Sequence, residues 1–298
     1  METYRNLFFL AFTTLTLVIF GCDPTGSNGD DDDGDDDVVG EWAMVDAGLY
    51  FTCGVRTDGT IDCPVITDQG GPGDVPTGSD FKEVVVGQDD MCALDNDGHV
   101  ECWTRTGHSE WPLPSPDGEF IHIAIGVYAG CGIDLDGHIS CWSEEGNEMY
   151  TFLPAEDEYR DITVMRGQCA CGINTEGRIR CGGTDESPEG DFIQFDSGEG
   201  NLCGVKTDGE VVCWPEDPEN VFQGALDPPG GVFINVTTGA YHSCGIREDG
   251  SAECWGRDEE GQSSPPSASF RDISGGRYHT VGITTEGELE MWGDPEAH

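Results

Sequence analysis

From Trp42 onward, apolar and polar residues follow one pattern that is repeated seven times. Each unit, roughly 38 residues long, opens with an aromatic residue and a short apolar strand that ends at a glycine. A second apolar strand, an acidic residue followed by glycine, and a third strand come next. Short apolar runs bounded by Gly, Asp and Pro, without a long helical periodicity, indicate an all-β protein. The opening aromatic residues are Trp42, Phe81, Phe120, Tyr159, Phe192, Phe233 and Phe270. The strand-ending glycines are Gly48, Gly87, Gly126, Gly198, Gly239 and Gly276, and the fourth unit has its glycine displaced to Gly167.

The acidic residue and glycine of each unit predict a hairpin with a three-residue loop, such as Thr57-Asp58-Gly59. In this loop a type I turn is followed by a left-handed residue, a conformation that glycine adopts at low cost. Counting back from the loop places Cys53 opposite Cys63 on one face of the sheet. As a non-hydrogen-bonded pair, their Cα atoms are expected about 4.5 Å apart, a separation that a disulfide accepts. The equivalent loop glycines are Gly59, Gly98, Gly137, Gly177, Gly209, Gly250 and Gly287.

Twelve of the 14 cysteines form pairs at this spacing, and they predict six disulfides, each within one unit. The last unit lacks both cysteines and has Val281 and Met291 instead, which fits bonded pairs better than independent thiols. Metal binding is the alternative, but it needs ligands that converge four at a time. Cys169 is left over, and it is either free or a competitor of Cys171 for Cys181. Disulfides of this number imply an oxidising compartment. The predicted pairs are Cys53–Cys63, Cys92–Cys102, Cys131–Cys141, Cys171–Cys181, Cys203–Cys213 and Cys244–Cys254.

Units of this length bury little surface alone and have to stack on one another. Seven antiparallel sheets hide their edges best when they close into a ring. The sequence therefore predicts a seven-bladed β-propeller over residues 41–298. Each blade has three strands, and the variable connections leave room for a fourth.

Two segments carry the motifs of a known family. The stretch GAYHSCGIREDGSAECWGRDEEGQ (Gly239–Gln262) resembles a repeat of the regulator of chromosome condensation family, and GGRYHTVGITTEGELEMWG (Gly275–Gly293) is similar. The resemblance covers roughly residues 42–293 and implies a seven-bladed propeller. The cysteine pairs, the missing Trp-Gly at Pro64 and at Cys181, and the short connections depart from the eukaryotic members. The short units look more like the secreted bacterial β-lactamase inhibitor proteins built on this repeat.

The N-terminal region predicts export and lipid anchoring. An apolar run from Leu7 to Phe20 has the length of a secretory signal and is followed by Gly21 and Cys22. We expect residues 1–21 to be a lipoprotein signal peptide and Cys22 to be acylated, so that the chain is held in the cell envelope facing the periplasm or the exterior. An ordinary secretory signal with a chance cysteine is the alternative. Residues 22–40, rich in Asp, are expected to be a disordered acidic tether, with a calcium-collecting tail as the alternative.

The charge of the chain limits its partners. With 59 acidic and 13 basic residues the net charge is −46. Such a surface repels nucleic acid and anionic lipid headgroups, so we expect no nucleic-acid partner and membrane contact only through the anchor. It fits basic partners, cations, or simply solubility, and we expect a monomer. The charge and the predicted export also exclude the chromatin and nuclear exchange roles of the eukaryotic namesake.

The sequence shows no catalytic or phosphate-binding motif, so we predict a protein that is not an enzyme and has no cofactor or metal. His242 and His279 stand at the family's usual His position and are expected to serve the turn. The segments Asp95–Val100 and Asp134–Ile139 look like calcium loops, but they lack the remaining ligands of an EF-hand.

Four tyrosines stand three residues before the first cysteine position of their units: Tyr50, Tyr128, Tyr241 and Tyr278. Equivalent positions of a propeller lie in a ring on one face, and aromatic side chains with a polar tip are favoured interface anchors. We interpret this ring as a candidate protein-binding face, with packing between blades as the alternative. The expected function is a protein-interaction module. The alternatives are an inhibitor of a β-lactamase or another envelope hydrolase, a glycan- or cell-wall-binding protein, and a purely structural surface protein.

Overall fold

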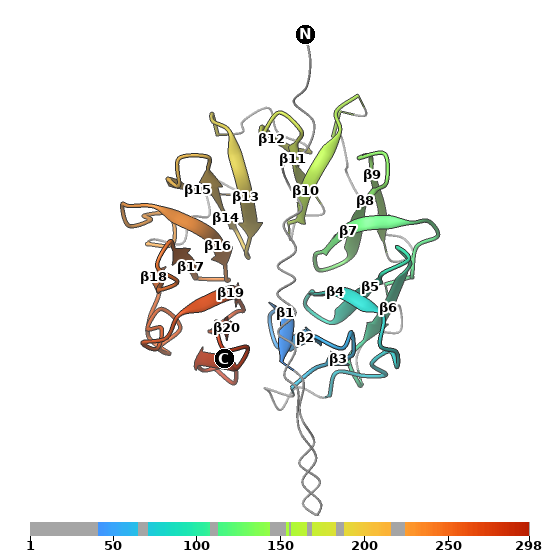
Figure 1. The fold of residues 1–298 in the computed structure, drawn as a ribbon, viewed down its shortest axis with the longest axis horizontal. Helices are drawn as coiled ribbons and strands as arrows, with labels where there is room; N and C mark the ends of the chain where they lie inside the picture. Colours follow the sequence, from blue (N-terminus) through green and yellow to red (C-terminus); the bar gives the residue numbers. More distant parts are fainter. Residues whose placement is uncertain are drawn as a thin grey trace, which may run out of the picture. The chain divides into compact units, whose positions relative to one another are not determined.

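The computed structural model describes residues 41–64, 71–107, 113–143, 153–154, 156–165, 169–182, 188–215 and 224–297. These ranges form seven three-stranded antiparallel sheets arranged as blades around a central axis (Figure 1). The predicted all-β, seven-bladed propeller is confirmed, and each blade has three strands in the described ranges. Blade 1 comprises β1 to β3, and the numbering continues in chain order to blade 7 with β19 to β21. The predicted signal peptide, the acylated Cys22 and the acidic tether lie outside the described residues. No helix long and apolar enough to span a bilayer occurs in the described part of the chain.

The innermost strand of each blade starts with the aromatic residue that opens its unit. These aromatic side chains are buried, with at most 8% of their surface exposed. In six blades the ring packs on a glycine of the second strand, where a side chain would collide with it: a Cβ on Gly132, for example, would lie 2.3 Å from the Phe120 ring. The Cys-Gly pair of the repeat therefore makes room for the opening aromatic residue. The inner strands are β1 (Trp42–Ala47), β4 (Phe81–Val86), β7 (Phe120–Ile125), β10 (Tyr159–Val164), β13 (Phe192–Ser197), β16 (Phe233–Thr238) and β19 (Phe270–Gly275).

The second and third strands form the predicted hairpin in every blade. Gly59 of the first loop has a φ of 84°, the left-handed conformation that the three-residue turn requires. Val55 pairs with Ile61, as the register derived from the sequence demands. The second strands are β2 (Thr52–Arg56), β5 (Asp90–Asp95), β8 (Ala129–Asp134), β11 (Ala170–Asn174), β14 (Asn201–Lys206), β17 (His242–Arg247) and β20 (His279–Thr284). The third strands are β3 (Ile61–Asp62), β6 (Val100–Thr104), β9 (Ile139–Ser143), β12 (Ile179–Cys181), β15 (Val211–Pro215), β18 (Ala252–Gly256) and β21 (Leu289–Gly293).

Six disulfides join the second and third strands of blades 1 to 6, with the predicted partners. The Cα atoms of each pair are 4.0 Å apart, close to the expected separation. Cys171 is bonded to Cys181, which leaves Cys169 as a half-buried thiol outside any disulfide. In blade 7, Val281 pairs with Met291 in the same register. The hairpin geometry therefore does not depend on the covalent bond.

A collar of glycines lets neighbouring blades approach each other at the ends of the inner strands. A Cβ on Gly48 would lie 2.0 Å from the carbonyl oxygen of Gly87, and one on Gly198 would lie 2.0 Å from that of Gly239. Equivalent close contacts link Gly87 to Gly126 and Gly239 to Gly276. The strand-ending glycines of the repeat are therefore required by backbone contact between blades.

The ring closes between blade 7 and blade 1 without exchange of a strand, since each described sheet is built from consecutive strands. The backbone N–H of Trp42 donates to the carbonyl oxygen of Gly287, 3.2 Å away. The Arg271 guanidinium donates to the carbonyl oxygen of Trp42. Closure therefore rests on side chains and loops at the seam between the first and last blades.

Candidate functional site

The propeller has two faces with different chemistry. We call the face where the inner strands end the loop face, because it carries the loops between first and second strands. We call the opposite face, with the hairpin turns, the turn face.

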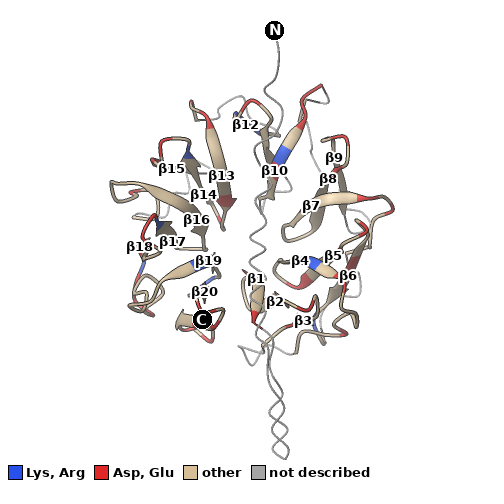
Figure 2. Ribbon diagram, in the orientation of Figure 1, with Lys and Arg blue, Asp and Glu red and all other residues tan. Residues whose placement is uncertain are grey.

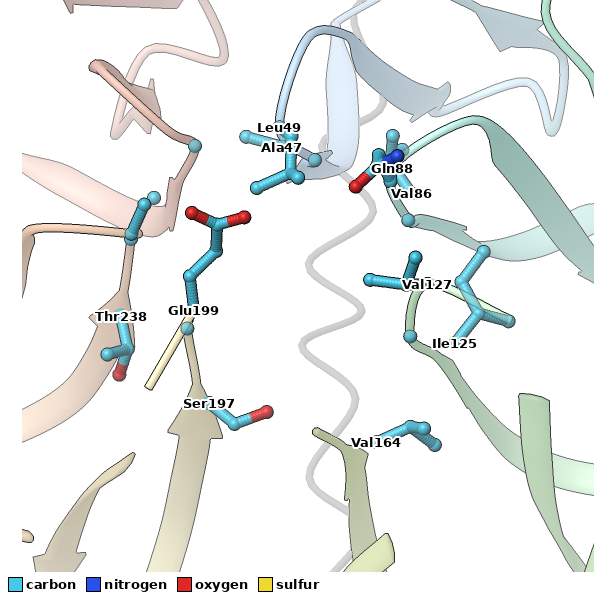
Figure 3. Close-up of a pocket in the computed structure, with 18 residues that line it drawn as sticks. Ala47, Leu49, Val86, Gln88, Ile125, Val127, Val164, Ser197, Glu199 and Thr238 are labelled. Atoms are coloured by element: carbon cyan, nitrogen blue, oxygen red, sulfur yellow. The ribbon is translucent and has the colours of Figure 1, made fainter. Parts of the chain in front are cut away.

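A cavity of about 90 Å³ opens on the loop face, among the loops between first and second strands and next to the glycine collar. Gln88, Val127 and Glu199 point into it from three different blades (Figure 3).

A larger cavity of about 330 Å³ follows the axis and is lined by the inner strands. Its polar side chains bind the backbone of the next blade. The Asp46 carboxylate accepts a hydrogen bond from the N–H of Val86 at 2.7 Å, and Asp196 accepts one from Thr238 at 2.8 Å. The Ser274 hydroxyl accepts one from Ala47 at 2.9 Å. These side chains satisfy N–H groups on the free edges of the inner strands, which the sheets leave unpaired.

Burial changes the protonation of the carboxyl groups in this channel. It raises the pKa of Asp196 to about 7 and that of Asp272 to about 6, although backbone N–H groups bonded to both oppose the shift. His122 differs, because it lies between two carboxylates. Its Nδ1 is 2.6 Å from Glu83, and its Nε2 is 3.3 Å from Asp161. Burial opposes its charged form, but these carboxylates raise the pKa of His122 well above the usual value.

These shifts predict a propeller that is more stable at pH 6 than at pH 8. Asp196, Asp272 and His122 bind their protons more tightly in the folded chain than in the unfolded chain. The stability that they contribute is therefore lost as the pH rises through their folded-state pKa values. Burial lowers the pKa of His242 to about 3 and that of His279 to about 4. The stability that these neutral histidines contribute is lost as the pH falls below 6.5, the pKa of a histidine in the unfolded chain. The histidines thus reduce stability below about pH 6.5, and Asp196 and His122 reduce it above that value, so the maximum lies near pH 6.5.

Urea unfolding at the two pH values measures this difference. The Asp196→Asn variant is the matched control, because it keeps an acceptor for Thr238 and cannot ionise. It should show a smaller difference between pH 6 and pH 8 than the parent chain. Equal unfolding midpoints of the parent at both pH values would contradict the prediction.

The structure brings three of the four predicted tyrosines together on the loop face. The Tyr241 and Tyr278 rings are stacked, with centroids 5.4 Å apart. Tyr50 of blade 1 joins them through Arg277, whose guanidinium donates to its hydroxyl at 3.0 Å. Tyr128 lies on blade 3, with 45% of its surface exposed and outside this group. The tyrosines therefore form an arc over blades 6, 7 and 1 instead of a complete ring.

Arginines lie between and beside these tyrosines. The Arg257 guanidinium is 5.4 Å from the centroids of both Tyr241 and Tyr278, and that of Arg277 is 5.3 Å from Tyr278 and 5.9 Å from Tyr50. Arg105 of blade 2 continues the series, 5.7 Å from Tyr50. These are cation–π distances. We call the set Tyr50, Tyr241, Tyr278, Arg105, Arg257 and Arg277 the tyrosine–arginine arc.

Acidic residues neutralise part of this arc. Arg105 pairs with Asp89 at 2.5 Å, and Arg257 pairs with Glu259 and Glu260 at 2.6 and 2.9 Å. Burial opposes the charge of Arg277, but hydrogen bonding with Tyr241 and the nearby Glu199 raise its pKa. Figure 2 shows how sparse basic residues are elsewhere on the ribbon. The arc is therefore a largely half-buried cluster of tyrosines and guanidinium groups on a strongly acidic molecule. Tyr278 is buried, with 7% of its surface exposed, and thus packs between its neighbours.

The repeat pattern of the sequence does not predict the arginines of the arc. A signal was present, since only 13 residues of the chain are basic. Arg277 directly precedes Tyr278, and Arg257 follows the Trp-Gly of its unit.

A polar seam under the arc joins the same blades. His242 Nε2 lies 2.7 Å from the Thr280 hydroxyl, and His279 Nε2 lies 3.2 Å from that of Thr52. Both imidazoles are fully buried. His242 also packs on Gly239, because a Cβ there would lie 2.4 Å from its ring. These histidines occupy the turn and the contact between blades.

Within the described ranges, no three His, Cys, Asp or Glu side chains are placed to hold a metal ion together. The segment Asp95–Val100 instead forms its hairpin turn, in which the Asp95 carboxylate accepts a hydrogen bond from the N–H of His99 at 2.8 Å. The Asp134 carboxylate accepts the equivalent bond from His138 at 2.9 Å. Both carboxylates that suggested calcium loops therefore bind their own turns.

Comparison with known proteins agrees with this architecture. The Regulator of chromosome condensation (RCC1) repeat matches residues 233–262, which contain most of blade 6. The CRINKLY WD40 ectodomain of the Arabidopsis thaliana receptor kinase ACR4 is 22% identical, with 84% of this chain and 97% of that chain covered and a TM-score of 0.63. The ectodomain of the Physcomitrella patens receptor kinase CR4 is 19% identical, with coverage of 84% and 73% and a TM-score of 0.66. Human WBSCR16 is 12% identical, with coverage of 83% and 87% and a TM-score of 0.64. No curated protein matches the sequence. The chain is thus an RCC1-like seven-bladed propeller.

Proposed function

We propose that this chain is a monomeric, non-catalytic protein-interaction module, held outside the cytoplasm by acylation of Cys22. The tyrosine–arginine arc is the observation that carries this proposal. Tyr and Arg are, with Trp, the side chains enriched among the anchors of protein interfaces, because they bury a large area and keep polar tips for hydrogen bonds. Disulfides and the glycine collar hold the arc on a rigid frame, which lowers the entropy that binding costs.

The location rests on the cysteine chemistry and the N-terminal motif. Six disulfides fit an oxidising compartment. The apolar run before Cys22 supports export followed by acylation. Residues 22–40 then act as the tether that leads to the first strand of the propeller.

Capture from solubilised cell envelope of the producing organism tests the proposed function. We expect the immobilised oxidised chain to retain a defined protein at raised salt, which removes contacts that depend only on long-range charge. Tyr50→Ala and Arg257→Ala should each reduce retention at least about tenfold, as expected of interface anchors. Tyr128→Ala, outside the arc, and Arg247→Ala, on the turn face, are the matched controls.

The controls separate the arc from the complete tyrosine ring and from general charge effects. Equal loss with Tyr128→Ala would favour the ring, and equal loss with Arg247→Ala would show a dependence on charge alone. Unchanged retention by both arc variants, with unchanged thermal unfolding, would exclude the arc as the binding site. Retention of cell-wall glycan instead of protein would favour the glycan-binding alternative.

A further inference from the structure

A second surface feature lies on the turn face, away from the arc. Among the described residues, seven large hydrophobic side chains are exposed, and five of them lie on this face. We call these five the aliphatic patch. Its members are Ile121, Leu135, Ile193, Val232 and Ile234, with 41% to 70% of their surface exposed.

A β-bulge in the inner strands exposes the three isoleucines. In β13, Phe192 pairs with Lys206 and Gln194 pairs with Val205, so that Ile193 has no position in the ladder. An extra residue of this kind bends the strand and turns its side chain in a new direction. All seven inner strands have this irregularity at their second residue. The bulge residues are Ala43, Lys82, Ile121, Arg160, Ile193, Ile234 and Arg271, and all are exposed.

The bulge side chains lie over the seam between one blade and the next. Arg160 donates to the carbonyl oxygens of Phe192 and Ile193 in the following blade. Arg271 reaches Trp42 across the closing seam in the same way. An arginine at this position therefore has partners, whereas an isoleucine leaves an apolar surface in water. Packing within the chain does not explain Ile at this position in blades 3, 5 and 6.

Val232 extends the apolar surface beside Ile234. It precedes the opening aromatic residue of blade 6, a position where the first five blades have Glu or Asp. It lies against the hairpin turn of blade 5, since a Cβ on Gly209 would be 2.5 Å from its side chain. Ile193, Val232 and Ile234 thus belong to two adjacent blades, 5 and 6.

Carboxylates lie on the same face as this patch. Every hairpin turn has an exposed Asp or Glu before its glycine: Asp58, Asp97, Asp136, Glu176, Asp208, Asp249 and Glu286. Two of the nearby basic side chains are paired with acidic ones, Lys206 with Glu210 at 2.8 Å and Arg178 with Glu176 at 3.4 Å. The bulge residues Lys82, Arg160 and Arg271 add three positive charges to the same face, fewer than the seven turn carboxylates. The turn face therefore combines exposed aliphatic side chains on blades 3, 5 and 6 with an excess of negative charge.

We propose that the turn face is a second docking surface, and that it binds a basic amphipathic polypeptide segment. Aliphatic side chains of that segment cover the isoleucines, and its Lys and Arg residues meet the turn carboxylates. Charge complementarity selects this occupant. A second copy of this chain would place two acidic rims against each other at a net charge of −46 each, and an anionic membrane would be repelled.

Three synthetic peptides test this proposal against the full oxidised chain. The first is an amphipathic leucine–lysine peptide, the second has serine in place of leucine at the same charge, and the third has glutamate in place of lysine. At a raised salt concentration of about 0.3 M, where exposed charges are strongly screened, we expect the leucine–lysine peptide to bind at least about tenfold more tightly than either other peptide.

The double variant Ile193→Ser/Ile234→Ser assigns the binding to the patch. It should weaken the leucine–lysine complex about tenfold and leave serine–lysine binding unchanged. Because both side chains are exposed, thermal unfolding should also be unchanged. Met291→Ser is the matched control, since Met291 is 47% exposed on the third strand of blade 7. Equal binding of all peptides, or full affinity of the double variant, would overturn the proposal.

Discussion

Reduction of the six disulfides is expected to unfold the propeller at room temperature. Each bond closes a loop with a sequence separation of 10 and contributes about 2–3 kcal/mol by restricting the unfolded chain. The free energy of unfolding of a typical domain is about 5–15 kcal/mol, so six such contributions account for most or all of it. Circular dichroism and Trp fluorescence, with and without a strong reductant, measure the loss.

A single bond provides the graded control. The variant Cys203→Ser/Cys213→Ser should remain folded, with its free energy of unfolding about 2–3 kcal/mol below that of the parent. Blade 5 should keep its hairpin without the bond, because in blade 7 Val281 and Met291 pair in the same register without a covalent bond. A reduced chain that unfolds at the same denaturant concentration as the oxidised chain would refute the expectation.

Substitution in the glycine collar is expected to have the second largest effect. A Cβ on Gly198 would lie 2.0 Å from the carbonyl oxygen of Gly239, so one of two rigid backbones has to move. Forcing atoms into a packed contact costs typically about 1–3 kcal/mol, and backbone on both sides leaves little room for relaxation. We expect Gly198→Ala to lower the free energy of unfolding by about 2–3 kcal/mol, measured by urea unfolding.

Gly230→Ala is the control for the same chemical change. No atom lies within 4 Å of a Cβ at Gly230, and its φ is outside the left-handed region. That variant should unfold within about 0.5 kcal/mol of the parent chain, as surface substitutions usually do. Similar losses in both variants would show that the collar does not depend on close contact between the blades.

The glycine collar was only partly predictable from the sequence repeat. The sequence places a glycine at the end of most first strands, but it does not reveal which atom the glycine faces. In the structure that atom belongs to the next blade, about one repeat away in the chain. The bulge of the inner strands is a similar case. Buried residues at Phe192 and Phe195 are three apart, a spacing that departs from strict alternation and indicates the extra residue.

The candidate site was predicted in part. Tyr50, Tyr241 and Tyr278 were found because they occupy one position of the repeat. Their grouping, and the separate place of Tyr128, depend on what neighbouring blades contribute. Tyr50 meets Arg277 across 227 residues, a contact that exists only because the ring closes. No periodicity in the chain encodes which side chains meet there.

The sequence by itself determined the seven units, the hairpin register and the disulfide pairs. These features are local, because partners lie within about ten residues and a single turn geometry relates them. Only the tertiary structure decided the tyrosine–arginine arc, the carboxylates that bind the next blade, and the aliphatic patch. Each of these joins separate blades, and their geometry follows from how sheets stack around an axis and close.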